Sequence, residues 1–279
     1  MDIGIERVVG NGMGLSLAGP LVMGIVNATP DSFFDGGVYD DKEGLAGRID
    51  RFLDEGADLV DIGGESTRPG ATPVTPDEEM SRILHAVEHA LESGAFVSVD
   101  TRRPEVARTV LGMGVHMINC VGGIASPELV SAVVEHGAAV AIMHMKGDPA
   151  TMQKDPTYDD VVGEVCGHLS GQVDLALEAG IGRESIVIDP GIGFGKTLEH
   201  NLALLNHLDR LLDIGQPVLI GTSRKSVIGK VLDLPPGERL EGSVASCVVA
   251  LTMGASMFRV HDVLETRRAL DMAHAILRP

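Results

Sequence analysis

Eight short apolar runs alternate with amphipathic segments from residue 21 to the end of the chain. Each run is nearly continuous in apolar residues, which is typical of parallel strands that are buried on both faces. Repeated strand and helix units predict an α/β fold around a parallel sheet. The runs are Leu21–Val26, Asp58–Ile62, Ala95–Val99, His116–Asn119, Ala138–Met143, Ser185–Asp189, Pro217–Gly221 and Ser256–Val260.

The ends of the intervening segments carry the signals of helix caps. Thr75 precedes a helix expected over residues 76–93, and Glu78 is placed to close a capping box with it. Ser126 is the expected N-cap of a second helix, which ends where Gly137 can adopt a left-handed conformation. The expected inward stripe of that second helix is Leu129, Val130, Val133 and Val134.

Eight strands, each followed by a helix, predict a closed (β/α)8 TIM barrel, although a doubly wound open sheet gives a similar string. The strand count favours the barrel. A glycine-rich turn at residues 10–12 predicts a β-hairpin ahead of the first strand, where it could plug the bottom of the barrel. We therefore expect one domain over residues 1–279, with an N-terminal β-hairpin in 1–20 and the barrel in 21–279.

Charge and cysteine content exclude several classes of partner. The chain has 22 Lys and Arg against 40 Asp and Glu, a formal charge of −18, so nucleic acid would be repelled by most of the surface. Cys120, Cys166 and Cys247 are far apart and odd in number, which favours reduced thiols over a disulfide framework. Because no apolar run approaches the ~20 residues of a membrane span, we expect a cytoplasmic protein without a membrane partner.

In a TIM barrel the functional groups lie at the carboxyl ends of the strands. One set of residues at these positions combines carboxylates with an amide and an amine, which matches a flat, nitrogen-rich heterocycle. Each Asp in it could instead be a helix N-cap. The set is Asp100, Asn119, Asp189 and Lys225.

A second set at the strand ends is basic and polar, as a phosphate or diphosphate site requires. Its asparagine could offer an oxygen to Mg²⁺. The alternative is that Arg68 and Arg259 pair with surface acids such as Asp35 or Asp262. This set is Asn27, Thr67, Arg68, Arg259 and His261.

Six motifs, all at expected strand ends and spread over nearly the whole chain, closely resemble the dihydropteroate synthase family. They are MGIVNATPDSFFDGG at 23–37, DIGGESTRPGA at 61–71, SVDT at 98–101, VIDPGIGFGKT at 187–197, PVLIGTSRKS at 217–226 and RVHD at 259–262. The resemblance implies condensation of 6-hydroxymethyl-7,8-dihydropterin diphosphate with 4-aminobenzoate, giving dihydropteroate and pyrophosphate in folate synthesis.

The resemblance also implies a role for each residue. Those implied to hold the pterin are Asp100, Asn119, Asp189 and Lys225, with Met143 as an apolar floor. Those implied to hold the diphosphate and Mg²⁺ are Asn27, Arg259 and His261. A first loop supplies Asp31 and Phe33, and a second supplies Thr67, Arg68 and Pro69. Phe194 lies near the aminobenzoate site, where sulfonamides compete, and Ser223 with the start of its helix is the implied seat of the aminobenzoate carboxylate, which a helix N-terminus would favour. The implied catalytic groups are Asp31, Asp100, Lys225, Arg259 and His261, and the family implies a homodimer through outer helices near the C-terminal end.

Two other motifs do not support a different function. GIGFGKT at 191–197 has one residue too few between its glycines for a P-loop, and by resemblance its Lys196 leads into the next helix. His85, Glu88 and His89 match a metalloprotease pattern, but they lie opposite the apolar stripe of an outer helix.

Three positions depart from the family pattern. Ala28 stands where Val is usual, Phe34 where Ser is usual, and Cys120 where Asp commonly follows the pterin-binding Asn. Because strand neighbours point to opposite sides, Cys120 is expected to face away from Asn119.

Two alternative functions stay open. One is a homologue that binds pterin without turnover, and the other is a corrinoid-linked pterin methyltransferase that shares the barrel and the Asp and Asn set.

Overall fold

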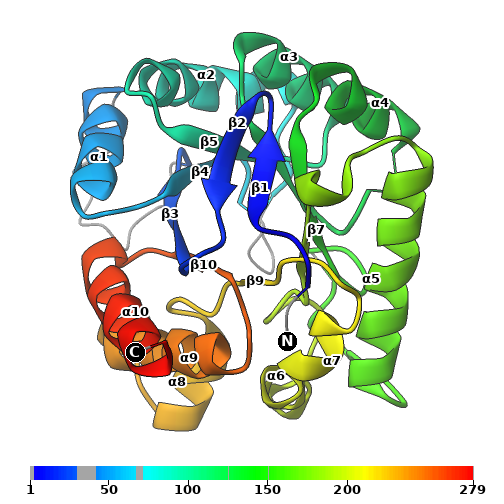
Figure 1. Cartoon of the computed structure of the whole chain (residues 1–279), viewed down its shortest axis with the longest axis vertical. Helices are drawn as coiled ribbons and strands as arrows, with labels where there is room; N and C mark the ends of the chain where they lie inside the picture. The colour runs from blue at the N-terminus through cyan, green and yellow to red at the C-terminus, as the bar shows by residue number, and fades with distance from the viewer. Residues whose placement is uncertain (1–2, 30–41, 67–71, 125, 150, 279) are drawn as a thin grey trace.

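Eight parallel strands form the barrel that the sequence predicts, and helices surround it (Figure 1). The computed structural model describes residues 3–29, 42–66, 72–124, 126–149 and 151–278. The order of the strands in the sheet is β8-β7-β6-β5-β4-β3-β10-β9, and a bridge between Ile188 and Val218 joins the two ends. The strands are β3 (Leu21–Asn27), β4 (Leu59–Gly63), β5 (Phe96–Asp100), β6 (Met117–Val121), β7 (Ala139–Met143), β8 (Ile186–Asp189), β9 (Leu219–Ile220) and β10 (Met257–Val260).

In the part of the chain that the structure describes, one α-helix follows each of the first five barrel strands and the last one, whereas β8 and β9 are each followed by two. The helices are α1 (Lys42–Asp54), α2 (Pro76–Glu92), α3 (Pro104–Met113), α4 (Pro127–His136), α5 (Val161–Glu178), α6 (Leu198–Asn206), α7 (Leu208–Leu212), α8 (Ser226–Leu232), α9 (Leu240–Thr252) and α10 (Val263–Leu277). None of the helices in the described part of the chain is long and apolar enough to cross a membrane.

The predicted caps are largely confirmed. The Thr75 side chain accepts the backbone N–H of Glu78, and Ser126 accepts that of Leu129. Gly137 has φ 58° at the end of α4, as expected for a left-handed C-cap. The side chain of Glu78 pairs with Arg82 on the same helix. The inward stripe of α4 was predicted one residue too wide, because Val134 is exposed.

The core has two parts, on either side of the barrel wall. Outward-facing strand residues pack against the helices, and inward-facing residues fill the lower barrel with Val8 of the hairpin among them. The inner set also holds Leu21, Met23, Leu59, Phe96, Met117, Ala139, Ala141, Val187, Leu219 and Met257.

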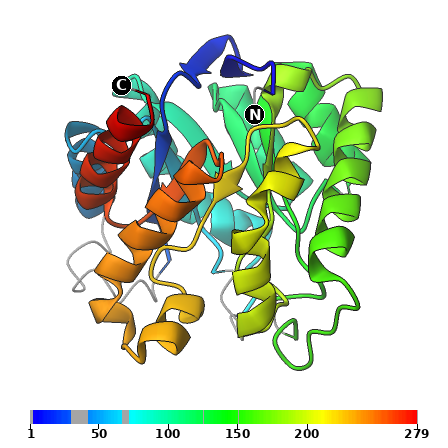
Figure 2. The same ribbon diagram turned by 60° about the horizontal axis from the view of Figure 1, so that its bottom comes forward.

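The N-terminal hairpin closes the amino-terminal end of the barrel (Figure 2). It consists of β1 (Arg7–Gly10) and β2 (Met13–Ser16), joined at Asn11 and Gly12, which both have positive φ as a tight hairpin turn requires. A side chain at Gly10 would overlap the carbonyl oxygen of His116, so the hairpin approaches the ends of β6 and β7 closely. The prediction of a hairpin that plugs the barrel is confirmed.

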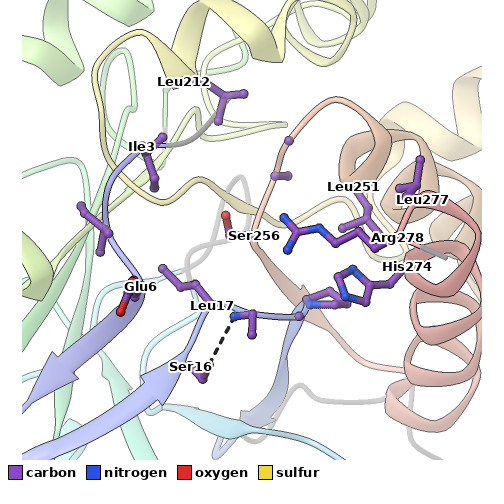
Figure 3. Close-up of a pocket in the computed structure, with 16 residues that line it drawn as sticks. Ile3, Glu6, Ser16, Leu17, Leu212, Leu251, Ser256, His274, Leu277 and Arg278 are labelled. Carbon is purple, nitrogen blue, oxygen red and sulfur yellow. Dashed lines mark hydrogen bonds between the residues drawn. The ribbon is translucent and has the colours of Figure 1, made fainter.

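A hollow lies beside this hairpin, at the opposite end from the predicted site (Figure 3). Leu17, Leu212 and Leu251 contribute apolar surface to it, and His274 and Arg278 contribute polar groups. It contains none of the residues that the motifs single out, so the functional site must be sought at the other end.

Candidate functional site

Polar side chains line the upper interior of the barrel, above the apolar lower layers. Strand pairing sets Asp100 beside Asn119 and Met143 beside Asp189, each on neighbouring strands. Because alternate residues of a strand face the same side, the strands that supply apolar side chains below supply these polar ones above. The structure therefore brings these four residues together at one end of the barrel.

Asp61 lies at the centre of this layer, and sequence reasoning missed it. Its side chain is buried, with 0% exposure, and its carboxylate accepts hydrogen bonds from Ser98 Oγ at 2.6 Å and from Asn119 Nδ2 at 3.0 Å. Its signal was present: an acid in the middle of a strand that is buried along its whole length, in phase with Leu59 and Gly63. Sequence-based prediction considered the polar residues at the ends of the apolar runs, whereas Asp61 lies in the middle of one.

Arg259 joins two of the acids. Its Nε–H donates to Asp61 Oδ2 at 2.6 Å and its Nη2–H to Asp100 Oδ2 at 3.1 Å. Burial alone would lower the pKa of this guanidinium, but the carboxylates of Asp61, Asp100 and Asp189 raise it above its ordinary value. The alternative that Arg259 pairs with Asp262 is wrong, because Asp262 pairs with Arg224.

Asp100 is an acid under opposing influences. Its pKa is raised to about 7, first of all by burial and then by the neighbouring carboxylates of Asp61, Glu79 and Glu65, whereas the charge of Arg259 acts in the opposite direction. A carboxyl group with this pKa can gain or lose a proton near neutral pH. It can therefore match either a donor or an acceptor on a bound heterocycle.

Asp189 and Lys225 lie on the other side of the mouth. Asp189 Oδ1 accepts the backbone N–H of Gly191 at 2.7 Å, and Lys225 Nζ donates to the carbonyl oxygen of Ile192 at 2.7 Å. Burial lowers the pKa of Lys225 to about 8, against the opposing charge of Asp189. Burial also raises the pKa of Asp189, and Lys225 opposes that shift.

Phe194 and Ser223 lie next to these groups. The ring centroid of Phe194 is 4.7 Å from Lys225 Nζ. Ser223 Oγ lies 3.1 Å from His261 Nδ1 and accepts the backbone N–H of His261 at 3.1 Å. The site thus has an aromatic face next to a lysine, and a serine next to a histidine.

Asn27 ends β3 at the same end of the barrel, paired in register with Gly63. Within the described residues no group of three or more His, Cys, Asp or Glu lies together as a resident metal site. Mg²⁺ usually keeps several waters and takes few protein ligands beside substrate phosphates. A single amide oxygen at the mouth fits an ion that is held mainly by a bound diphosphate.

The remaining sequence predictions divide between described and undescribed residues. Cys120 faces outward as predicted: it is buried in the outer core, and its Sγ contacts the carbonyl oxygen of Gly123 at 2.9 Å. Ala28 packs partly buried against the same core. His89 of the metalloprotease-like pattern contacts Asp50 of α1 at 2.7 Å. Asp31, Phe33, Phe34, Asp35, Thr67, Arg68 and Pro69 lie outside the described residues.

Known proteins resemble this chain along nearly its whole length. Residues 23–261 match the family model described as pterin binding enzyme. Dihydropteroate synthase of Escherichia coli K12 is 43% identical over 272 residues, which are 97% of this chain and 96% of that protein. A crystal structure of Yersinia pestis dihydropteroate synthase with a sulfonamide drug has a TM-score of 0.94 at 40% identity, covering 98% of this chain and 100% of that one. That of Xanthomonas albilineans dihydropteroate synthase with 4-aminobenzoic acid has a TM-score of 0.91 at 43% identity, covering 99% of each chain.

Proposed function

The chain belongs to the dihydropteroate synthase family of pterin-binding enzymes, and we propose on that basis how its residues carry out the reaction. The enzyme is a transferase. It joins the methylene carbon of 6-hydroxymethyl-7,8-dihydropterin diphosphate to the amine of 4-aminobenzoate, and pyrophosphate leaves. One observation carries the assignment of roles. Arg259 donates hydrogen bonds to Asp61 and Asp100, and the charge of Asp189 also raises the pKa of Arg259. Acids suited to a heterocycle and a base suited to its leaving group therefore share one mouth.

The pterin lies between the carboxylates. Asp100 and Asp189 accept its N–H and amine edges, and Asn119 and Lys225 serve the mixed edge that remains. Asn119 is held in orientation because its amide nitrogen donates to Asp61. Met143, buried at the end of β7 beside Asp189, supplies the apolar floor.

The diphosphate lies against Arg259 and His261. When the bond between carbon and diphosphate oxygen breaks, negative charge accumulates on the departing group, so a cation there stabilises the transition state more than the substrate. Mg²⁺, held through Asn27 and the diphosphate, would neutralise part of that charge when bound. The electron pair of the aminobenzoate amine then forms the new C–N bond, and the amine loses a proton.

Other groups complete the site in this proposal. Phe194 and Ser223 receive the aminobenzoate, with its ring against the Phe194 ring and its carboxylate near Ser223. Helix α8 is only seven residues long, so the serine rather than a helix dipole is the relevant polar group. Asp31, Phe33, Thr67, Arg68 and Pro69 retain the loop roles implied by the family, where closure excludes water that would compete with the amine.

The working form of the enzyme in this proposal is a homodimer through the outer helices near the C-terminal end. Helix α9 is apolar around most of its circumference, which is typical of a helix covered on all sides, yet Val249 is 53% exposed. Val231 and Leu232 of the neighbouring α8 are exposed as well. A second copy of the chain would cover these side chains.

The proposed location of the protein is the cytoplasm. Its three cysteines are free thiols, which is typical of a reducing compartment; they are Cys120, Cys166 and Cys247.

Release of pyrophosphate tests the function directly. Purified protein given the pterin diphosphate, 4-aminobenzoate and Mg²⁺ should release pyrophosphate and form dihydropteroate in equal amounts. Omission of 4-aminobenzoate should abolish dihydropteroate formation. Pterin binding without release of pyrophosphate would identify the non-catalytic homologue. Methyl transfer from a methylated pterin to a corrinoid would identify the methyltransferase instead.

A further inference from the structure

A lysine without a role in the reaction proposed above lies buried beside the site. Lys196 is 2% exposed and follows β8 at the end of the segment 190–196. The family resemblance implies that Lys196 and Thr197 lead into the next helix. Thr197 does so, as the N-cap of α6, whereas the Lys196 side chain turns inward and ends among polar groups.

The Lys196 ammonium has three close acceptors for its three protons. Nζ lies 3.0 Å from the carbonyl oxygen of Gly191, 3.0 Å from that of Phe194 and 2.9 Å from Nδ1 of His144. Burial lowers the pKa of His144 to about 3, so this imidazole is neutral and its Nδ1 can accept. Burial also lowers the pKa of Lys196 to about 7, against the opposing charge of Asp189.

Two of these acceptors, the carbonyl oxygens of Gly191 and Phe194, belong to the loop 190–196, and His144 lies in the segment after β7. Gly191, Gly193 and Gly195 alternate along the loop with φ values of 68°, 87° and 61°. Side chains at Gly191 and Gly195 would overlap the carbonyl oxygens of His144 and Lys146, so the loop lies directly against the segment after β7. The backbone conformation depends on glycine at these positions.

The same loop contacts Lys225 of the candidate site in two places. Both lie in the stretch 191–194, whose first and last carbonyl groups accept from Lys196. The carbonyl oxygen of Ile192 accepts Lys225 Nζ at 2.7 Å, and the ring of Phe194 lies 4.7 Å from the same nitrogen. At the start of the loop, the N–H of Gly191 donates to Asp189. A shift of the loop would therefore move Phe194 and the partner of Lys225 together.

Core packing alone does not account for a lysine at this place. The hydrogen-bond partners of Lys196 given above are neutral, and the charge of Asp189 does not offset its burial, which lowers its pKa. Burying a cation in this way has a large desolvation penalty. A methionine would fill similar space without that penalty. The contacts that balance the cost are those to the loop carbonyls, and those carbonyls flank the site.

We propose that Lys196 is a positioning residue whose ammonium, by holding the carbonyl groups of Gly191 and Phe194, fixes the Phe194 ring and the Ile192 carbonyl and so shapes the seat of the aminobenzoate. This inference rests on the function proposed above. It extends that function, because Lys196 acts through the loop and does not touch either substrate. His144 contributes by offering the third acceptor.

Steady-state kinetics of Lys196→Met test the proposal. We expect KM for 4-aminobenzoate to rise about 10- to 100-fold, as loss of hydrogen bonds to a charged group implies, while KM for the pterin diphosphate changes less than about threefold. Lys154→Met, at an exposed lysine after β7, is the matched control and should keep both constants. If Lys196→Met does not fold, Lys196→Gln, which retains N–H donors, should show the same split to a smaller degree.

A chemical rescue separates positioning from packing. Lys196→Ala should regain affinity for 4-aminobenzoate when ethylammonium is added, and ethanol should not restore it, because only the cation supplies three donors. Unchanged constants in the folded methionine variant, or equal losses for both substrates without rescue, would overturn the proposal. Absence of pyrophosphate release by the wild-type enzyme in the same assay would instead overturn the proposed function.

Discussion

The carboxylate of Asp61 and the guanidinium of Arg259 meet at 2.6 Å inside the barrel, although 198 positions separate them in the chain. They come from β4 and β10, which flank β3 in the sheet. Asp61 also accepts from Ser98 and Asn119, so a single buried acid orients a basic group proposed for the diphosphate and an amide proposed for the pterin. The two halves of the site are therefore physically linked beneath the substrate.

Asp61→Asn should lower both stability and activity. Removal of one partner from a buried ion pair typically costs about 3–5 kcal/mol, so the free energy of unfolding in urea should fall by about that amount. Asp58→Asn is the control. Asp58 directly precedes β4, the strand that carries Asp61, and it pairs with Arg267 at the other end of the barrel. The control variant should reduce stability less and leave kcat/KM for both substrates unchanged. Normal kcat/KM in folded Asp61→Asn would show that Arg259 needs no such support.

Arg259→Ala should affect the leaving group more than the heterocycle. Loss of a charged donor that stabilises the transition state lowers kcat by about 100- to 1000-fold in comparable sites, and kcat/KM for the pterin diphosphate should fall accordingly. The Kd of 6-hydroxymethylpterin, which lacks phosphates, should change much less when measured by calorimetry. Equal losses for both molecules would place Arg259 against the ring.

Asp61 and Arg259 illustrate how much of the site can be predicted from the sequence. Arg259 was predicted because it stands near the end of an apolar run, where a barrel exposes its functional groups. Its partner was missed, because the pairing of Asp61 with Arg259 requires the closed barrel, which brings β4 and β10 to either side of one strand. Local patterns predict the strand and the direction of a side chain, whereas its partner two strands away in the sheet depends on the pairing of the first barrel strand with the last.

The same distinction explains Lys196. The sequence shows a lysine after a glycine-rich segment, and nothing local distinguishes an exposed lysine from a buried one. Its burial follows from three left-handed glycines that fold the segment back against the residues after β7. The outward direction of Cys120, by contrast, follows from strand alternation alone, and the structure confirms it.

The pH dependence of pterin binding should report Asp100. Burial raises its pKa to about 7 from an ordinary 3.8, so between these pH values the native protein holds a proton that the unfolded chain has released. This contribution to stability is complete below pH 3.8 and is lost as the pH rises through about 7. If the ionised carboxylate binds the pterin, affinity should increase with pH up to about 7, by up to about tenfold per pH unit.

Calorimetric titration of 6-hydroxymethylpterin across this pH range checks the expectation. The Asp100→Asn variant provides the control, because its amide cannot titrate, and its weaker affinity should be independent of pH. A wild-type Kd that stays constant through neutral pH would mean that Asp100 binds the ring without ionising.

The exposed apolar face of α8 and α9 gives the last prediction. Val249→Glu places a charge on this face, where a second copy would have to bury it. If the wild type forms the proposed dimer, the variant should sediment as a monomer at the same concentrations. Leu175→Glu on α5 is matched, since Leu175 and Val249 are both 53% exposed, and it should leave the wild-type sedimentation unchanged. The melting temperature of Val249→Glu should also become independent of protein concentration, because association no longer contributes to stability. Dimers that persist in Val249→Glu would mean that subunits meet elsewhere, and the apolar character of α9 would then need another explanation.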